Sequence, residues 1–549
     1  PGARSAVSAS SSVGGNGGGS AAPGARSSPD TPASLAGERP PNVLVLAAGS
    51  LRADRLDPRV APNLSKLAAR ATRFDRAYVS LPSTSPSWVT ILSGRYAHRH
   101  GVRSDVPTRE EPAGAFDALP ARFAEAGYAT GVVSDRAGGV FGRADLGFAY
   151  VDAPSFDARR RSRQQVLERA APHLPVLHTR AGRLLFPDMR EVGSATDPRL
   201  LAEDVAAALR AMRDRPFFVA AFFSAADAPP SPAPCSAALT DCSYRGRFKY
   251  EAPVSLAAAG AAAPDAADVR QVQGLYDGAV GAFDAATGRV LAALERLGLA
   301  ERTIVVVTAG HGESLFEGGR GRGHGAHLFG DEGTHVPLVI YDPRVAGAGA
   351  RDVASPRPDA RGGAGEAGGR RERALVRDVD LAPTLYELAG IAPPRDLDGR
   401  SLAPALRGAP LAPRFAYAET DLWLDEDVPG LPAHLRLPYP GLVGLTELDA
   451  RRGAALVLRE EMREVTRTAR HRMVRDARWK LVYAPTRAGV RYMLFDTEAD
   501  PGEVDDVAAA HPDEVARLRA ALWSWMLEDP TMEQRDGFLV PVRRLEGAR

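Results

Sequence analysis

Five continuous apolar runs constrain the fold of this chain more than any other feature of its sequence. They lie at Asn42–Ala48, Thr130–Ser134, Phe217–Phe223, Thr303–Thr308 and Val336–Tyr341. Short runs without polar alternation are typical of strands that are buried on both faces of a parallel sheet. Between them, apolar residues recur every three or four positions at Pro62–Thr72 and Val269–Leu297, which indicates helices. Strands that alternate with helices predict an α/β fold with a doubly wound, mostly parallel sheet flanked by helices.

The length of the chain predicts more than one domain, because 549 residues are more than a single hydrophobic core usually contains. The expected parts are a disordered Ser/Gly/Pro-rich stalk at 1–40, an α/β domain at 41–423 with a flexible Gly/Arg-rich insertion at about 346–373, an excursion at 424–467, and a small C-terminal domain at 468–549. In the last part, Arg472–Tyr483 and Tyr492–Asp496 indicate antiparallel hairpin strands, and His511–Met526 indicates a helix.

Charge and composition exclude several classes of function. The net charge is +1 and no basic run carries interleaved aromatic residues, so we expect no nucleic-acid partner. We also expect no transmembrane segment, because no run of about eighteen apolar residues is present. Residues 1–40 contain no apolar signal core. They fit a stalk left after signal removal, which favours export to the periplasm, the cell surface or the medium, and they fit a fragment boundary equally well.

The two cysteines, Cys235 and Cys242, lie in a Pro/Ala/Ser-rich stretch that is typical of a loop. Their spacing would close a small disulfide ring, which suits an oxidising compartment. Two unpaired thiols are the alternative. A metal site is disfavoured here, because two thiols without nearby histidines supply only half of a tetrahedral site.

Several blocks of sequence resemble, in order, those of one enzyme family. The blocks are Asn42–Leu56, Ala61–Tyr78, Thr84–Val102, Gly310–Ser314, Asp331–Ile340, Asp380–Leu402, Arg478–Tyr483 and Leu494–Glu503. Together they are similar to the sulfatase family of the alkaline phosphatase superfamily, and the resemblance extends from Asn42 to about Leu527. It implies an alkaline-phosphatase-like fold and the hydrolysis of small-molecule or glycan sulfate or phosphate esters. It also implies a divalent cation, which neutralises the negative charge gathered on the transferred group.

Two positions at which the resemblance implies carboxylate metal ligands hold glycine. The first position follows the first apolar run, where this chain has Gly49, and the second immediately precedes His311, where it has Gly310. Glycine offers no ligand. We therefore expect a degenerate metal site, and an active enzyme would need replacement carboxylates close to Thr84.

The nucleophile position also departs from the family pattern. Sulfatases carry a Cys or Ser there that is oxidised to formylglycine, whereas this chain reads Thr84-Ser85-Pro86-Ser87-Trp88. Threonine cannot become formylglycine, although it can attack a phosphorus centre. Trp88 stands where the resemblance implies an anion-clamping arginine. An ordinary helix start, with a hydroxyl cap and proline in the first turn, explains the same residues.

The remaining polar residues define the candidate site. Asp227 replaces a histidine of the family pattern, and His311, His324 and His327 remain, the last two on a Gly-rich loop. The catalytic candidates are Thr84, His311 and His324; the anion-binding candidates are Ser85 and Ser87 at a helix N-terminus; the metal candidates are Asp227, His311 and His327. The ion would be Ca²⁺, Mg²⁺, Mn²⁺ or Zn²⁺, of which zinc suits imidazole. Loop histidines that bond the backbone, with no metal, are the alternative.

Three hypotheses follow. In the first, the chain keeps the sulfatase fold but has lost most or all catalysis, and it binds sulfated or phosphorylated ligands. In the second, it is an active metal-dependent phosphate or sulfate ester hydrolase with Thr84 as nucleophile. In the third, it is a structural surface protein displayed on the stalk. Gly49 and Gly310 favour the first.

Overall fold

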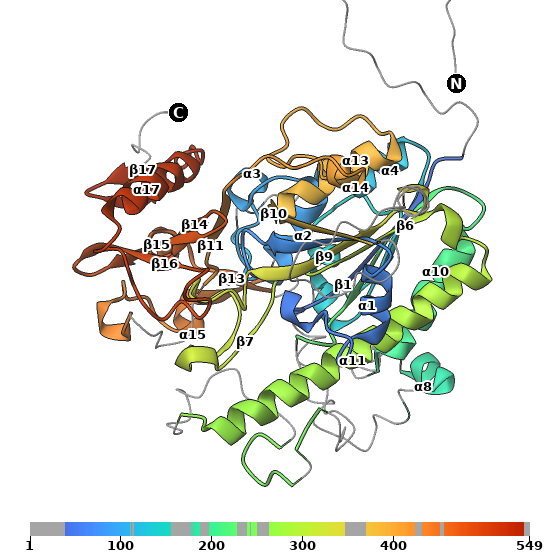
Figure 1. Ribbon diagram of the computed structural model, residues 1–549, viewed down its shortest axis with the longest axis horizontal. Coiled ribbons are helices and arrows are strands. Elements are labelled where there is room, and N and C mark those ends of the chain that lie inside the picture. The colour runs from blue at the N-terminus through green and yellow to red at the C-terminus, as the bar shows by residue number, and fades with distance from the viewer. Residues whose placement is uncertain are drawn as a thin grey trace, which may run out of the picture. The chain divides into compact units, whose positions relative to one another are not determined.

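An eight-stranded sheet in the order β10-β2-β9-β6-β1-β5-β3-β4 forms the core of the computed structural model (Figure 1). Its strands are β1 (Asn42–Ala48), β2 (Thr72–Tyr78), β3 (Ala129–Ser134), β4 (Tyr150–Asp152), β5 (Phe217–Phe223), β6 (Thr303–Thr308), β9 (His335–Tyr341) and β10 (Arg370–Arg377). Strand β1 pairs in parallel with β5 and β6, and all of its residues are buried. Among the described strands of this sheet, only β9 runs antiparallel to both of its neighbours, β2 and β6. The predicted mostly parallel α/β sheet is confirmed.

The structure describes residues 39–109, 111, 115–154, 176, 179–186, 197–227, 239–241, 243–249, 263–345, 369–422, 431–450 and 455–542. The predictions for Cys235 and Cys242, for nearly all of the stalk, and for residues 346–368 of the insertion lie outside the described residues. The chain divides into two units, 1–39 and 40–549, and every element named here belongs to the second.

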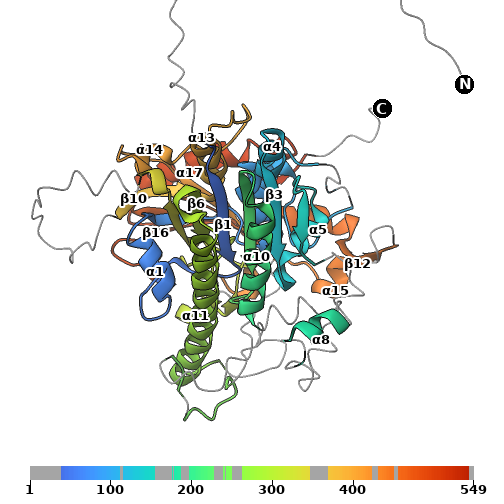
Figure 2. The same cartoon turned by 90° about the vertical axis from the view of Figure 1, so that its right-hand side faces the viewer.

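Helices cover both faces of the sheet, as the side chains of β5 show. Phe222 packs edge-on against Trp88 of α2, while the next residue, Phe223, packs against Phe283 of α11. Because successive strand residues point to opposite faces, α2 and α11 lie on opposite sides of the sheet. Helix α10 lies beside α11 on the same face (Figure 2).

The described helices are α1 (Pro62–Ala68), α2 (Thr84–Ser93), α3 (Ala97–His100), α4 (Leu119–Glu125), α5 (Val140–Arg143), α8 (Arg180–Leu185), α10 (Pro198–Met212), α11 (Ala266–Arg296), α13 (Leu381–Ala389), α14 (Ala403–Leu406), α15 (Leu442–Leu445), α16 (Arg463–Thr468) and α17 (Pro512–Met526). None of these is long and apolar enough to cross a membrane. Helix α11 begins at a capping box, in which Asp265 and Asp268 each bond the other's backbone amide.

A smaller antiparallel sheet follows the main sheet, in the order β11-β14-β15-β16. Its strands are β11 (Ala416–Glu419), β14 (Arg472–Arg475), β15 (Trp479–Thr486) and β16 (Gly489–Asp496). Helix α17 buries Leu518, Leu522 and Trp525 against it. Three short pairs complete the strands: β7 (Ser314–Leu315) with β8 (Arg322–Gly323), β12 (Thr446–Asp449) with β13 (Ala455–Leu458), and β17 (Met532–Arg535) with β18 (Phe538–Pro541). The predicted small C-terminal sheet is thus present.

Two local predictions were wrong. The helix expected to extend to Thr72 ends at Ala68, and Thr72 begins β2. Arg370–Arg373, expected within the flexible insertion, form the start of β10. Strand β10 forms one edge of the sheet and β2 lies next to it, and both carry charged side chains that interrupt the continuous apolar pattern of the central strands.

Candidate active and metal-binding site

The candidate site lies beyond the carboxyl ends of three adjacent parallel strands. Gly49 follows β1, Asp227 lies shortly after β5, and His311 lies shortly after β6. The order β6-β1-β5 places these residues side by side. This is the edge at which open α/β sheets bind ligands.

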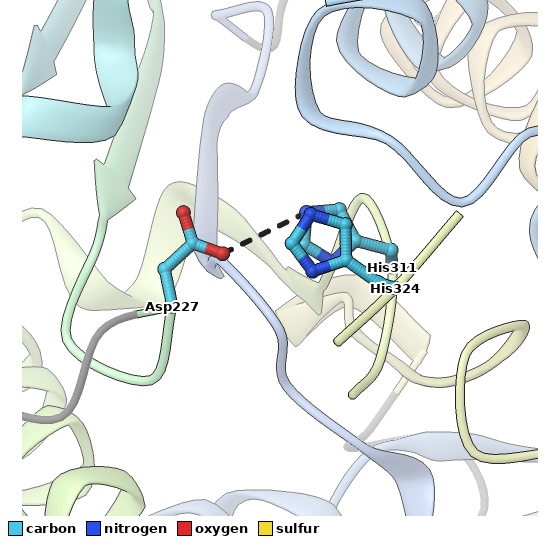
Figure 3. A group of neighbouring side chains, drawn as sticks. All are labelled: Asp227, His311 and His324. Carbon is cyan, nitrogen blue, oxygen red and sulfur yellow. Dashed lines mark ion pairs between the residues drawn. The ribbon is translucent and has the colours of Figure 1, made fainter. Parts of the chain in front are cut away.

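Asp227, His311 and His324 form a group that could hold a metal ion (Figure 3). One ligand atom from each residue lies within 4.8 Å of the others. The Asp227 carboxylate faces two stacked imidazole rings, whose centroids are 3.8 Å apart, and its Oδ1 lies 3.9 Å from Nε2 of His311. The group offers two nitrogens and one carboxylate oxygen.

His311 is held in one tautomer by its own loop. Its Nδ1 lies 3.0 Å from the carbonyl oxygen of Gly312, which can only accept, so Nδ1 carries the proton. The Nε2 lone pair then faces the hydroxyl of Thr84 at 3.2 Å. Burial lowers the pKa of His311, and the charge of His324 lowers it further. A neutral His311 can therefore accept the proton of Thr84.

His324 is bound to Glu313, a buried carboxylate that the sequence analysis missed. Nδ1 of His324 lies 2.8 Å from Oε2 of Glu313. Burial alone would lower the pKa of His324, but the hydrogen bond and charge of Glu313 and the charge of Asp227 raise it to about 9. Glu313 lies two residues after His311, so its place in the Gly310–Ser314 block was the available signal.

Ser50 connects the two carboxylates of the site. Its buried backbone is left-handed, with φ 58°. Its hydroxyl lies 2.8 Å from Oδ1 of Asp227 and 3.0 Å from Oε2 of Glu313. Ser50 therefore helps to fix the positions of Asp227 and of the carboxylate that holds His324.

A side chain at either of the two glycine positions would meet close neighbours. A Cβ at Gly49 would lie 3.0 Å from Cγ of Asp227, so the Asp227 side chain already fills this space. A Cβ at Gly310 would lie 3.2 Å from Cβ of Ser87. Both contacts are tighter than ordinary van der Waals packing. A side chain at either position would therefore require Asp227 or Ser87 to shift.

The helix start at Thr84 is occupied by a carboxylate from the same chain. Asp105 accepts hydrogen bonds from the backbone amides of Thr84, at 3.1 Å, and Ser85, at 2.7 Å. The anion site expected at Ser85 is therefore filled. The buried hydroxyl of Ser87, the other anion-binding candidate, donates to the carbonyl of Leu81 at 2.6 Å.

Trp88 belongs to the hydrophobic core. It is fully buried and packs edge-on against Phe141 and Phe222. The position at which the family resemblance implies an anion clamp thus presents an apolar ring to the interior. It supplies no positive charge for a substrate anion.

The structure does not bring His327 into the metal group, and His324 takes the place that was predicted for it. The ring of His327 stacks on Phe329, with centroids 6.3 Å apart. Burial and the charges of Arg320 and Lys480 lower the pKa of His327 to about 4. It stays neutral and packs away from Asp227.

The types of ligand atom in this group indicate which metal ion would fit. Ca²⁺ takes roughly six to eight oxygen ligands, and the Asp227, His311 and His324 group offers only the oxygens of one carboxylate. Two imidazoles and a carboxylate fit a transition metal such as Zn²⁺. Glu313 would serve as the outer carboxylate that orients a ligating histidine.

Comparisons with known proteins agree with this architecture. The sequence model of the sulfatase family matches residues 41–391. N-acetylgalactosamine-6-sulfatase of Canis lupus familiaris is 26% identical over 411 residues, which cover 68% of this chain and 68% of that protein. Arylsulfatase K of Bos taurus is 24% identical over 257 residues, which cover 47% of this chain but only 37% of that protein.

A solved phosphonate monoester hydrolase from Silicibacter pomeroyi shares the fold, with a TM-score of 0.62 at 22% identity over 92% of this chain and 100% of that chain. The chain therefore has the mostly parallel α/β fold of that hydrolase. The chain belongs to the sulfatase family.

Proposed function

We propose that this sulfatase-family protein has lost most or all hydrolysis of sulfate esters. The observation that carries the proposal is glycine at position 49, directly after β1, where the chain offers no carboxylate and a Cβ would lie 3.0 Å from Cγ of Asp227. Gly310 is a second position without a ligand. The transfer of a sulfuryl group gathers negative charge on oxygen atoms, which hard cations normally neutralise. The group of Asp227, His311 and His324 lacks the carboxylates at positions 49 and 310 with which the family would bind such an ion.

The residues around Thr84 support the same conclusion. The Asp105 carboxylate occupies the amides of Thr84 and Ser85, and Trp88 offers no positive charge. Threonine also lacks the gem-diol through which formylglycine expels sulfate. An aryl sulfate would therefore meet neither the family's carboxylate metal ligands, nor an anion-clamping arginine, nor a formylglycine nucleophile.

The test is hydrolysis of aryl sulfate, aryl phosphate and bis-aryl phosphate with Ca²⁺, Mg²⁺, Mn²⁺ or Zn²⁺ added. We expect the wild type and Thr84→Ala to match buffer with aryl sulfate under every metal. A sulfate-ester rate that vanishes in Thr84→Ala would show that the proposal is wrong. Exposed His434, replaced by alanine, controls for the handling of variants.

A metal-dependent phosphate ester hydrolase is the second candidate, favoured by the 3.2 Å contact between Thr84 and His311. Asp227, His311 and His324 would hold the ion, and a bound divalent cation would supply charge neutralisation. The single free lone pair of His311, on Nε2, can take either the ion or the proton of Thr84. A phosphate-ester rate that requires both Thr84 and an added divalent cation would support this candidate, whereas a rate that depends on Thr84 but falls when Zn²⁺ is added would contradict metal dependence and favour His311 as a base instead.

Export is a further part of the proposal, supported by the Ser/Gly/Pro-rich composition of residues 1–40. Fractionation of the source cells with an antibody to the α/β domain tests it. Recovery of the protein only with cytoplasmic markers would contradict it.

A further inference from the structure

The side chain of Asp105 is bound at the start of α2 as an external anion would be. Its Oδ1 accepts from the Ser85 amide at 2.7 Å, and its Oδ2 accepts from the Thr84 amide at 3.1 Å and the Ser83 hydroxyl at 2.6 Å. Two oxygens of a tetrahedral oxyanion would use the same three donors. Ligand and carboxylate therefore compete for one set of hydrogens.

Asp105 is anchored on both sides. Its amide donates to Oδ2 of Asp421 at 3.0 Å, and its carbonyl accepts from Arg143 at 2.9 Å. The Ser83 hydroxyl also lies 2.5 Å from Oδ2 of Asp421, so its one hydrogen goes to either Asp105 or Asp421, and a second carboxylate borders the same position. An incoming anion would have to displace a tethered competitor and approach a second negative charge.

The charge state of Asp105 agrees with this arrangement. Burial alone would raise its pKa, but hydrogen bonds from Ser83 and Ser85 and the charge of Arg143 bring the pKa below its usual value. The carboxylate stays ionised near neutral pH, where sulfate and phosphate esters are also charged.

We propose that Asp105 is a specificity-determining residue that excludes sulfate and phosphate groups from the helix start beside Thr84. It fills the oxyanion position with a carboxylate of the chain itself. This inference deepens the proposed loss of sulfate-ester hydrolysis and rests on it, because it identifies an obstacle to substrate binding that is separate from the missing metal ligands.

The test is calorimetric titration with inorganic sulfate and inorganic phosphate of the wild type, Asp105→Asn and Asp105→Ala. Hydrogen bonds to charged groups contribute enough that removing the competitor should tighten oxyanion binding about 10- to 100-fold in Asp105→Ala. Asp105→Asn should give an intermediate affinity, because an amide fills the space but bonds only one of the two backbone amides well. This isosteric variant decides the matter if Asp105→Ala does not fold.

Two further variants locate the effect. Ser85→Pro in the Asp105→Ala background removes one amide donor in the first helical turn, where proline is tolerated, and should abolish the gain. Asp241→Ala is the matched control, since Asp241 also accepts from an amide and a hydroxyl, both of Ser243, but on an exposed turn. It should gain no binding.

Equal oxyanion affinity in the wild type and both Asp105 variants would overturn the inference and leave the loss of hydrolysis untouched. Conversely, a wild type that hydrolyses aryl sulfate would overturn the proposed function, while the order of the three affinities would still report on Asp105. The two failures are therefore distinguishable.

Discussion

Asp227 occupies the space beyond Gly49, and a Cβ added at Gly49 would lie 3.0 Å from Cγ and 3.2 Å from Oδ1 of Asp227. The two residues follow the neighbouring parallel strands β1 and β5. A side chain at position 49 would therefore press on the Asp227 side chain, which would have to shift to admit it.

Gly49→Asp should destabilise the protein by about 1–3 kcal/mol, the usual cost of forcing atoms into a packed site. Gly49→Asp combined with Asp227→Ala should recover most of this loss, because the smaller side chain makes room. Urea denaturation of the two single variants and the double variant measures the coupling. Additive losses would mean that the two positions do not compete.

Zinc or cobalt should bind the protein more tightly than calcium, because the site offers two imidazoles and one carboxylate. Glu313→Gln should weaken binding roughly 10- to 100-fold, the usual effect of removing an outer carboxylate. Calorimetry gives the affinities, and the visible absorption of bound Co²⁺ reports the geometry. His324→Ala should abolish binding, whereas His327→Ala should leave it unchanged, and the reverse pattern would restore His327 as the ligand.

Acid should weaken the fold through the buried His100. Nδ1 of His100 accepts from the Val102 amide, so Nε2 carries the proton and donates to Thr90. Burial and the charge of Arg103 lower the pKa of His100 to about 3. The unfolded chain has an ordinary histidine pKa near 6.5, so this contribution to stability is complete above pH 6.5 and is lost as the pH falls toward 3.

The measurement is the free energy of unfolding in urea between pH 7 and pH 5. His100→Gln should reduce its slope by up to about 1.4 kcal/mol per pH unit, the value for one proton. Exposed His434, replaced by glutamine, is the matched control and should keep the wild-type slope. An unchanged slope in His100→Gln would mean that other groups take up the proton.

Lys480 of the C-terminal sheet forms a buried ion pair with Glu503 and also bonds the loop before β9. Its Nζ contacts both oxygens of Glu503, at 2.8 Å, and the carbonyl of Gly330, at 2.9 Å. Lys480→Met should cost about 3–5 kcal/mol, because it leaves a buried carboxylate without its partner. Lys480→Met with Glu503→Gln should recover part of this cost. Chemical denaturation measures both, and an equal loss in the two variants would exclude the charge explanation.

The fold was largely predictable because the central strands carry continuous apolar runs that only a buried sheet explains. Strands β2 and β10 were missed, since charged residues interrupt their apolar pattern and make the two segments resemble a helix or a loop. A single strand does not reveal its place in the sheet. That place depends on pairing between segments far apart in the chain.

The site was predictable only in part. Spacing alone cannot tell whether His324 or His327 faces Asp227, because both lie on one glycine-rich loop. Left-handed backbone at Gly325, with φ 80°, helps to separate the directions of the two rings. Asp105 was missed for another reason, since an acidic loop residue looks like solvated surface until its contacts with Thr84 and Ser85 are known.

Ser50 gives the site two alternative hydrogen-bonding states. A hydroxyl has one hydrogen, yet that of Ser50 lies within bonding distance of both Asp227 and Glu313. The two carboxylates therefore compete for this hydrogen, and only one of them accepts it at a time. A cation that binds Asp227 would release the hydrogen to Glu313, which in turn bonds His324. Metal binding at Asp227 would thus affect His324 through rotation of the Ser50 hydroxyl, which lies just after β1.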